Sequence, residues 1–139
     1  MPATRRPGGP HLRGSVHEWH VLQRPLPRTP AAARLARVTA RVATRAWRVP
    51  ALEEAAAAVA SELVGLVLRR DGAGVLTLRV LMTPRRLRLE VHDPTGGVHA
   101  DVDDDDPAVA LLAAYSARWG VDCHLPGAQL WAELPCPEP

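Results

Sequence analysis

Two helix-length segments follow one another in this chain, with only Val49 and Pro50 between them. In the first, residues 30–48, Thr29 is a suitable N-cap and Pro30 takes the favoured first helical position. Its apolar residues recur at helical spacing and predict a buried stripe of Leu35, Val38, Val42 and Val49. The second, residues 51–68, has a comparable stripe of Leu52, Ala55, Val59, Leu63 and Leu66. Two successive helices are inconsistent with a doubly wound sheet, in which strands and helices alternate.

Strand-like segments lie on both sides of these helices. Alternating residues predict a first strand over residues 16–22, followed by a proline-rich turn over residues 25–30. The remaining elements are expected in this order: strands 75–82 and 86–92, a loop 93–106, a helix from 107 to about 118, and strands 119–125 and 129–134. This order predicts an α+β sandwich with a mixed, mainly antiparallel sheet that helices cover on one face.

The strand over residues 86–92 shows the clearest alternation in the chain. Leu87, Leu89 and Val91 point to one side, and Arg86, Arg88 and Glu90 point to the other. This pattern predicts a sheet with one buried and one solvated face. The tryptophans that fall in or beside the predicted elements are expected in the core: Trp47, Trp119 and Trp131.

The composition indicates one small domain without a membrane segment. At 139 residues, the chain is long enough for a single hydrophobic core. We expect a disordered tail over residues 1–15, a folded domain over 16–135 and a short tail over 136–139. No apolar run approaches the roughly 18 residues that a membrane span requires, and the first segment lacks the apolar part of a secretory signal. Two cysteines give no disulfide framework, so we expect a reduced cytoplasmic protein.

Two short sequences, together with this order of elements, resemble the histidine-kinase-like ATPase (GHKL) superfamily. Ser61-Glu62-Leu63-Val64 lies late in the second helix, where the family typically has S-E-L-V-T-N-A. Residues 117–121, Ala-Arg-Trp-Gly-Val, follow the third helix, where the family often has D-R-W-G-V. The chain is most similar to the short bacterial anti-sigma-factor serine kinases common in actinobacteria. The resemblance covers residues 16–135 and implies the Bergerat fold, which binds ATP.

The resemblance implies that Glu62 occupies the position of the catalytic base of the family. Four residues further on, where the family has a magnesium-binding Asn, this chain has Leu66. The chain contains no Asn at all, so a shifted register cannot restore the ligand. Because Mg²⁺ requires oxygen ligands and leucine offers none, Glu62 is expected to be a vestigial base. We expect no metal site and no cofactor, with at most weak binding of ATP or ADP.

The other ATP-handling positions are partly kept and partly lost. By resemblance, Asp93 and Gly97 correspond to the adenine pocket, where an Asp accepts a hydrogen bond from the adenine amino group. The alternative is that Asp93 simply starts a turn before a proline. Two phosphate-binding glycines of the family align with Asp106 and Ala108, so side chains crowd the approach to the backbone amides. Residues 103–106 are all Asp; they repel a triphosphate, and we interpret them as a solvated acidic loop rather than a metal site.

Five arginines form one continuous stripe on the first predicted helix, beside its apolar stripe. They are Arg34, Arg37, Arg41, Arg45 and Arg48. Guanidinium groups suit carboxylates and phosphates, so the stripe is a candidate docking surface for an acidic partner. The alternative is an ordinary solvated helix face. The formal net charge is only +2 and basic residues are not interleaved with aromatic ones, which argues against nucleic acid as the partner.

The leading hypothesis is a degenerate ATPase-like regulatory domain, a pseudokinase, that acts by protein–protein binding in anti-sigma-factor-like control of transcription. Enzymatic activity is not expected. The resemblance implies a sigma factor or an anti-sigma antagonist as partner, and a homodimer is a further option. The first alternative is an active ATP-dependent serine/threonine kinase of the same class, and the second is a nucleic-acid-binding domain.

Overall fold

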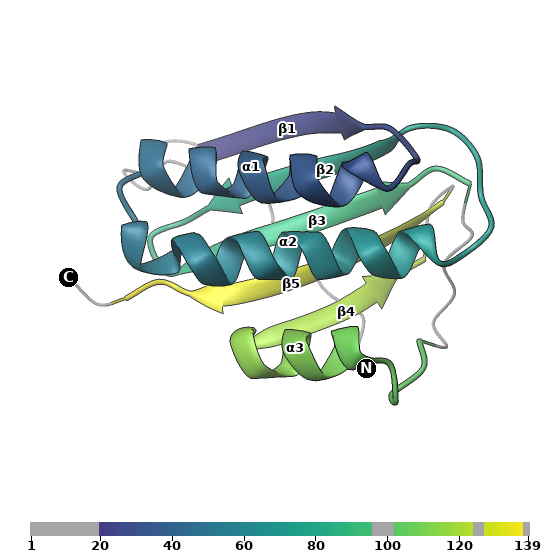
Figure 1. The fold of residues 1–139 in the computed structure, drawn as a ribbon. Coiled ribbons are helices and arrows are strands. Elements are labelled where there is room, and N and C mark those ends of the chain that lie inside the picture. The colour runs from purple at the N-terminus through teal and green to yellow at the C-terminus, as the bar shows by residue number, and fades with distance from the viewer. Residues whose placement is uncertain (1–19, 96–101, 124–126, 138–139) are drawn as a thin grey trace.

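A computed structural model describes residues 20–95, 102–123 and 127–137 of the chain. Its strands are β1 (His20–Leu26), β2 (Leu76–Met82), β3 (Arg86–Asp93), β4 (Arg118–Asp122) and β5 (Ala128–Pro135). Its helices are α1 (Ala31–Ala46), α2 (Glu53–Leu68) and α3 (Pro107–Tyr115), with a short 3₁₀ turn at Pro50–Leu52 before α2 (Figure 1). The predicted order of strands and helices is confirmed.

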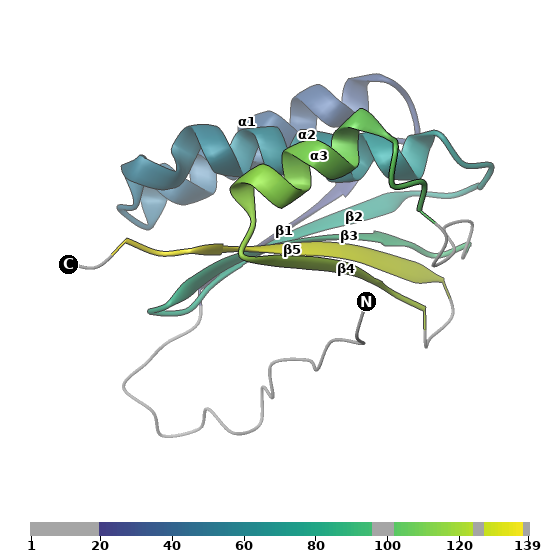
Figure 2. The same cartoon turned by 90° about the horizontal axis from the view of Figure 1, so that it is seen from below.

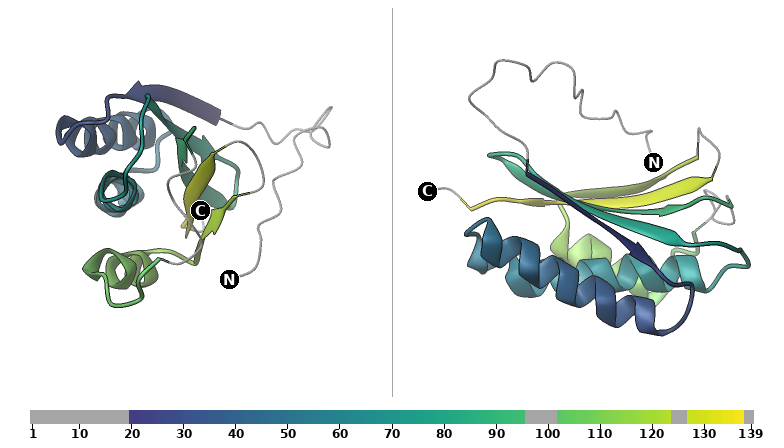
Figure 3. Two further views of the ribbon diagram at one scale, coloured as in Figure 1. Left: turned by 90° about the vertical axis from the view of Figure 1, so that its right-hand side faces the viewer. Right: turned by 90° about the horizontal axis from the view of Figure 1, so that it is seen from above.

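The five strands form one sheet in the order β1-β2-β3-β5-β4, and each of these neighbouring pairs is antiparallel. The three helices lie together on one face of this sheet, so the domain has two layers (Figure 2). α1 lies over β1 and β2, α2 over β3 and β5, and α3 beside β4 (Figure 3). The predicted α+β sandwich is therefore confirmed, although the described strands include no parallel pair.

The first strand continues further along the chain than its alternation predicts. β1 runs from His20 to Leu26, whereas residues 16–19 are outside the described part of the chain. Pro25, predicted to be in a turn, pairs with Thr77 of β2 inside the strand. A proline is tolerated there because β1 is an edge strand. It pairs with β2 alone, so the missing N–H of Pro25 costs no hydrogen bond to a strand on the other side.

α1 buries a different face from the one its larger apolar residues predict. Val38 and Val42 are 45% and 54% exposed. The buried face consists of small residues: Ala32, Ala36, Thr39, Ala40, Ala43 and Thr44. Small side chains allow the helix backbone to approach α2 and the sheet closely, and the two threonine hydroxyls donate to the carbonyls of Leu35 and Ala40 at 2.8 and 3.1 Å. The predicted apolar stripe is therefore wrong for Val38 and Val42, whereas Leu35 and Val49 are partly buried and pack against the core.

α2 provides the centre of the core, much as its sequence predicts. Val59 and Leu63 are fully buried, and Leu52 and Leu66 are 8% and 6% exposed. These side chains pack against the sheet residues Leu78, Val80, Leu89, Val91, Leu130 and Ala132. Each such leucine contributes about 1.5–3 kcal/mol by burial, so this layer contact stabilises the fold.

The helix-free face of the sheet also departs from expectation. Arg88 and Glu90 of β3, predicted to be solvated, are each only 4% exposed. They are buried because they form ion pairs within a cross-strand network, which compensates their desolvation. Trp47 and Trp119 pack against the main core as expected. Trp131, although 3% exposed, faces the other side of the sheet: it pairs with Glu90 across β3 and β5.

Candidate functional site

Glu62 and Leu66 lie one turn apart on α2. Glu62 is half-buried and makes no hydrogen bond or ion pair with a described residue. Leu66, at the position where the resemblance implies a metal ligand, belongs to the hydrophobic core. Among the described residues, no group of three His, Cys, Asp or Glu side chains could hold a metal ion.

Asp93 lies at the end of β3 and its side chain is fully buried. Its Oδ1 accepts hydrogen bonds from Arg28 Nη2 at 2.6 Å, from the Thr95 N–H at 3.0 Å and from the Thr95 hydroxyl at 2.6 Å. Burial raises the pKa of the Asp93 carboxyl, but the hydrogen bonds from Thr95 and Arg28 together outweigh it and hold this pKa below its usual range. Asp93 is therefore a buried carboxylate with internal partners. Gly97, the other predicted adenine-pocket residue, lies outside the described residues.

Arg28 connects three separate segments around Asp93. Besides the ion pair, it donates to the carbonyls of Ala73 and Gly74 in the turn between α2 and β2, at 3.1 and 3.3 Å. A Cβ at position 72 would lie 2.7 Å from Arg28 Nη1, so a side chain there would have to displace the Arg28 guanidinium group. The loop before α1, the turn before β2 and the end of β3 are thereby fixed to one another. Nothing in the local sequence around residue 28 indicates this role.

The buried ion pair leaves two polar atoms without partners in the described part of the chain. They are Arg28 Nη1 and Asp93 Oδ2. A pocket of about 330 Å³ lies beside the Arg28 side chain and is lined by Arg28, Thr29, Pro30, Leu68, Arg70, Asp71 and Gly72. Asp93 does not line this pocket.

The N-terminus of α3 is occupied by a carboxylate of the chain itself. Asp106 is the N-cap, and its side chain accepts a hydrogen bond from the Ala108 N–H at 2.9 Å. Arg69, which directly follows α2, donates to the same carboxylate at 3.3 Å. A helix N-terminus favours negative charge, and here Asp106 supplies it. The three preceding residues, Asp103 to Asp105, are exposed, so the predicted solvated acidic loop is confirmed for them but not for the partly buried Asp106.

The arginine stripe of α1 divides into two groups. Three members bind side chains of α2: Arg37 donates to Ser61 at 3.0 Å, Arg41 to Glu54 at 3.2 Å, and Arg45 to both carboxylate oxygens of Glu53 at 3.1 and 2.8 Å. The hydrogen bond from Arg45 lowers the pKa of Glu53. Arg34 and Arg48 are exposed and have no such partner among the described residues, and Arg48 lies beyond the end of α1 at Ala46 rather than on the helix as predicted. Much of the stripe therefore joins α1 to α2.

Comparison of the sequence with protein-family models gives no match, and comparison with curated proteins gives none either. Within the described ranges, no helix has the length and apolar character needed to cross a membrane. The residues that carry the family resemblance lie on α2 and at the start of β4. The resemblance implies three ATP-handling positions whose surroundings the structure now describes. They are the metal-ligand position Leu66, the adenine-pocket position Asp93 and the phosphate-binding position Asp106.

Proposed function

We propose that this chain is a regulatory domain that acts by binding another protein and that does not turn over ATP. The observation that carries the proposal is that Leu66 of α2 is buried in the hydrophobic core of the domain. A metal-dependent phosphoryl transfer needs an oxygen ligand near Glu62, and a buried alkyl side chain excludes both the ligand and the ion. The resemblance to the anti-sigma-factor kinases then applies to the scaffold rather than to the reaction.

Two internal contacts support the loss of nucleotide binding. Asp93, which would accept from the adenine amino group, already accepts three hydrogen bonds on Oδ1 from Arg28 and Thr95, and its remaining oxygen, Oδ2, is buried while Asp93 does not line the neighbouring pocket. Asp106 holds the Ala108 amide and also pairs with Arg69. A phosphate at this helix end would have to displace a carboxylate and would meet its negative charge at close range.

The outward face of α1 is the surface that we propose for the partner. Val38 and Val42 are about half exposed, and Arg34 lies one turn before Val38 on the same side of the helix. Exposed valines beside a guanidinium group can bury apolar area and pair with a carboxylate in the same contact. This combination fits an amphipathic acidic helix of a regulatory protein. By resemblance, that protein is a sigma factor or an anti-sigma antagonist.

Nucleotide binding is the first test of this proposal. Calorimetry with Mg-ATP should give a dissociation constant no better than about 1 mM, which corresponds to only about 4 kcal/mol. Turnover of labelled ATP should not exceed that of a Glu62→Ala variant. A micromolar constant, or turnover that depends on Glu62, would instead support an active serine/threonine kinase.

Partner binding is the second test. The full chain is assayed against the sigma factors and anti-sigma antagonists of its own host by titration calorimetry. The double variant V38E/V42E should lose at least tenfold in affinity for the true partner, because it places two carboxylates on the proposed surface. The control is Val75→Glu, which changes an equally exposed valine before β2. Binding that is unaffected by V38E/V42E would exclude this surface, and salt-dependent binding to duplex DNA would favour a nucleic-acid-binding domain.

A further inference from the structure

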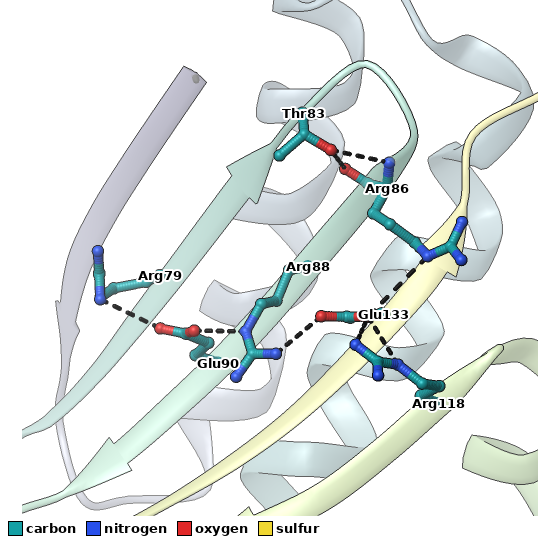
Figure 4. Close-up of polar contacts among 7 residues, drawn as sticks. All are labelled: Arg79, Thr83, Arg86, Arg88, Glu90, Arg118 and Glu133. Atoms are coloured by element: carbon teal, nitrogen blue, oxygen red, sulfur yellow. Dashed lines mark hydrogen bonds and ion pairs between the residues drawn. The ribbon is translucent and has the colours of Figure 1, made fainter. Parts of the chain in front are cut away.

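The helix-free face of the sheet carries an ionic network that crosses β2, β3, β5 and β4. Its members are Arg79, Arg86, Arg88, Glu90, Arg118 and Glu133 (Figure 4). The strand register brings them together: Arg79 lies opposite Glu90, Arg88 opposite Glu133, and Arg118 opposite the same Glu133. These residues are far apart in the sequence and meet only in the folded sheet.

Arg88 lies at the centre of this network. It donates to Glu90 through Nε and to Glu133 through Nη1, the latter at 2.8 Å. The Arg88 side chain is 5% exposed, and those of Glu90 and Glu133 are 5% and 9% exposed. Two carboxylates therefore compensate one buried guanidinium group, so the role of these three residues is to stabilise the sheet.

Two outer arginines add positive charge that these carboxylates do not balance. Arg118 donates to Glu133 through Nε at 3.1 Å and Nη2 at 2.7 Å, while Arg86 Nε lies 3.9 Å from the same oxygen. Burial raises the pKa of Glu133, but the hydrogen bonds from Arg118 and Arg88 outweigh this effect and hold the pKa below its usual range. Glu133 is therefore a carboxylate at neutral pH. The Arg86 and Arg118 side chains are 45% and 64% exposed. Their guanidinium groups thus remain accessible to a further anion.

A pocket of about 290 Å³ opens beside these two arginines. Its lining comprises Leu81, Thr83, Arg85, Arg86, Arg88, Arg118 and Glu133, which is four arginines against one carboxylate. Next to it, the guanidinium carbon of Arg88 lies 4.4 Å from the ring centroid of Trp131, and that of Arg118 lies at 5.9 Å. The buried Trp131 Nε1–H has no acceptor among the described residues. Cations, an unpartnered N–H donor and an aromatic ring thus lie close together on this face.

We propose that this face binds an acidic segment of a partner protein, with a carboxylate entering between Arg86 and Arg118. Charge complementarity carries the choice of ligand, because bidentate guanidinium groups suit carboxylates. The arginines extend from β2 to β4, which is three inter-strand steps or roughly 14 Å. A single small ion cannot contact all of them, whereas a peptide with several carboxylates can. The first 19 residues of the chain are not this ligand, because they carry three arginines and one glutamate.

This surface is separate from the one proposed on α1. The helices occupy the opposite layer of the domain, so a partner could contact either face alone (Figure 2). The two proposals can therefore fail independently. The sheet face also differs from the arginine stripe of α1, where three of the five arginines bind α2.

The direct test uses a fluorescein-labelled hexaglutamate peptide, titrated into the full chain at low salt and followed by fluorescence anisotropy. The double variant R86Q/R118Q should weaken binding at least tenfold. The matched control R34Q/R48Q removes two exposed arginines, one on α1 and one just after it, and should change the affinity less than twofold. Equal losses in both variants would mean unspecific charge attraction and would overturn the proposal, as would the absence of binding by the wild type.

The Trp131 indole N–H gives a local readout in ¹H–¹⁵N NMR spectra, with the signal assigned through a Trp131→Phe variant. Hexaglutamate should shift this signal, and hexaglutamine should not. Glu133→Gln provides a second variant that acts in the opposite direction: removal of the competing carboxylate should tighten hexaglutamate binding at least threefold. Weaker binding by a folded Glu133→Gln variant would overturn the proposal. So would saturation of the same shift by inorganic phosphate, or by a single-stranded oligonucleotide, at lower concentration than the peptide.

Discussion

Arg28 and Asp93 are 65 positions apart in the chain, and Arg28 Nη2 lies 2.6 Å from Asp93 Oδ1. The Asp93 side chain is fully buried and that of Arg28 is 15% exposed, so this is a nearly desolvated ion pair. It joins the loop before α1 to the end of β3 and, through two backbone carbonyls, to the turn before β2. The position that resembles an adenine-binding Asp thus has a structural role in this chain.

Loss of Arg28 is expected to destabilise the fold strongly. Arg28→Ala leaves the Asp93 carboxylate buried without its cation, which typically costs about 3 kcal/mol or more. Urea unfolding of the variant measures this change in the free energy of unfolding. Arg24→Ala, which changes an exposed arginine of β1, should cost less than about 0.5 kcal/mol. If adding Asp93→Asn to Arg28→Ala did not recover part of the loss, the ion pair would not be its cause.

Leu66→Asn should lower the free energy of unfolding by about 2–4 kcal/mol, because apolar burial is lost and an amide is left without adequate partners. Thermal melts with and without Mg-ATP measure both stability and any restored binding. Val38→Asn on the exposed face of α1 is the control and should have a small effect. An unchanged melting temperature that rises with Mg-ATP would show that an open nucleotide cleft exists at Leu66.

Asp106→Ala should destabilise α3 by about 1 kcal/mol, since the helix loses its N-cap and Arg69 loses its partner. Hydrogen exchange of the α3 amides, together with urea unfolding, reports this change. Asp104→Ala is matched to it, because Asp104 is exposed in the same acidic loop. Equal effects of the two substitutions would mean that the charge of the loop matters rather than the cap.

Glu133 should make the stability of the domain sensitive to acid. Its pKa is lower in the folded state than in the unfolded state, where it is about 4.3. The resulting stabilisation is fully present above the unfolded pKa and is lost as the pH falls through the folded pKa. Between about pH 5 and about pH 3, Glu133→Gln should therefore lose less free energy of unfolding than the wild type. Glu54→Gln removes a carboxylate that is 80% exposed and should keep the wild-type slope.

Periodicity predicted the elements better than it predicted their environments. On α2, the large apolar residues of the predicted stripe, Val59, Leu63 and Leu66, are all buried in the core. On α1, the valines and the arginines both lie on the outward half, and alanines and threonines form the contact. A prediction from hydropathy assigns the buried face of a helix to its large apolar side chains. The buried face of α1 was decided instead by how closely the helix lies to its neighbours.

Burial on the sheet could not be predicted from alternation either. Arg88 and Glu90 alternate with leucines, as solvated residues do, yet both are buried. Their burial is compensated because Arg88 also pairs with Glu133 of β5. The strand order, in which β5 lies between β3 and β4, places Glu133 there. No local pattern carries that order, which depends on the packing of the whole sheet.

The sequence by itself determined the element order, the α+β class and the positions of Glu62, Leu66 and Asp106, because spacing along a helix and capping are local properties. The tertiary structure alone decided which charged side chains pair with one another. Arg28 meets Asp93 and Arg69 meets Asp106 across 65 and 37 positions of the chain. Such contacts depend on how helices and strands pack in space, since burial and ion pairing are settled only when distant segments come together.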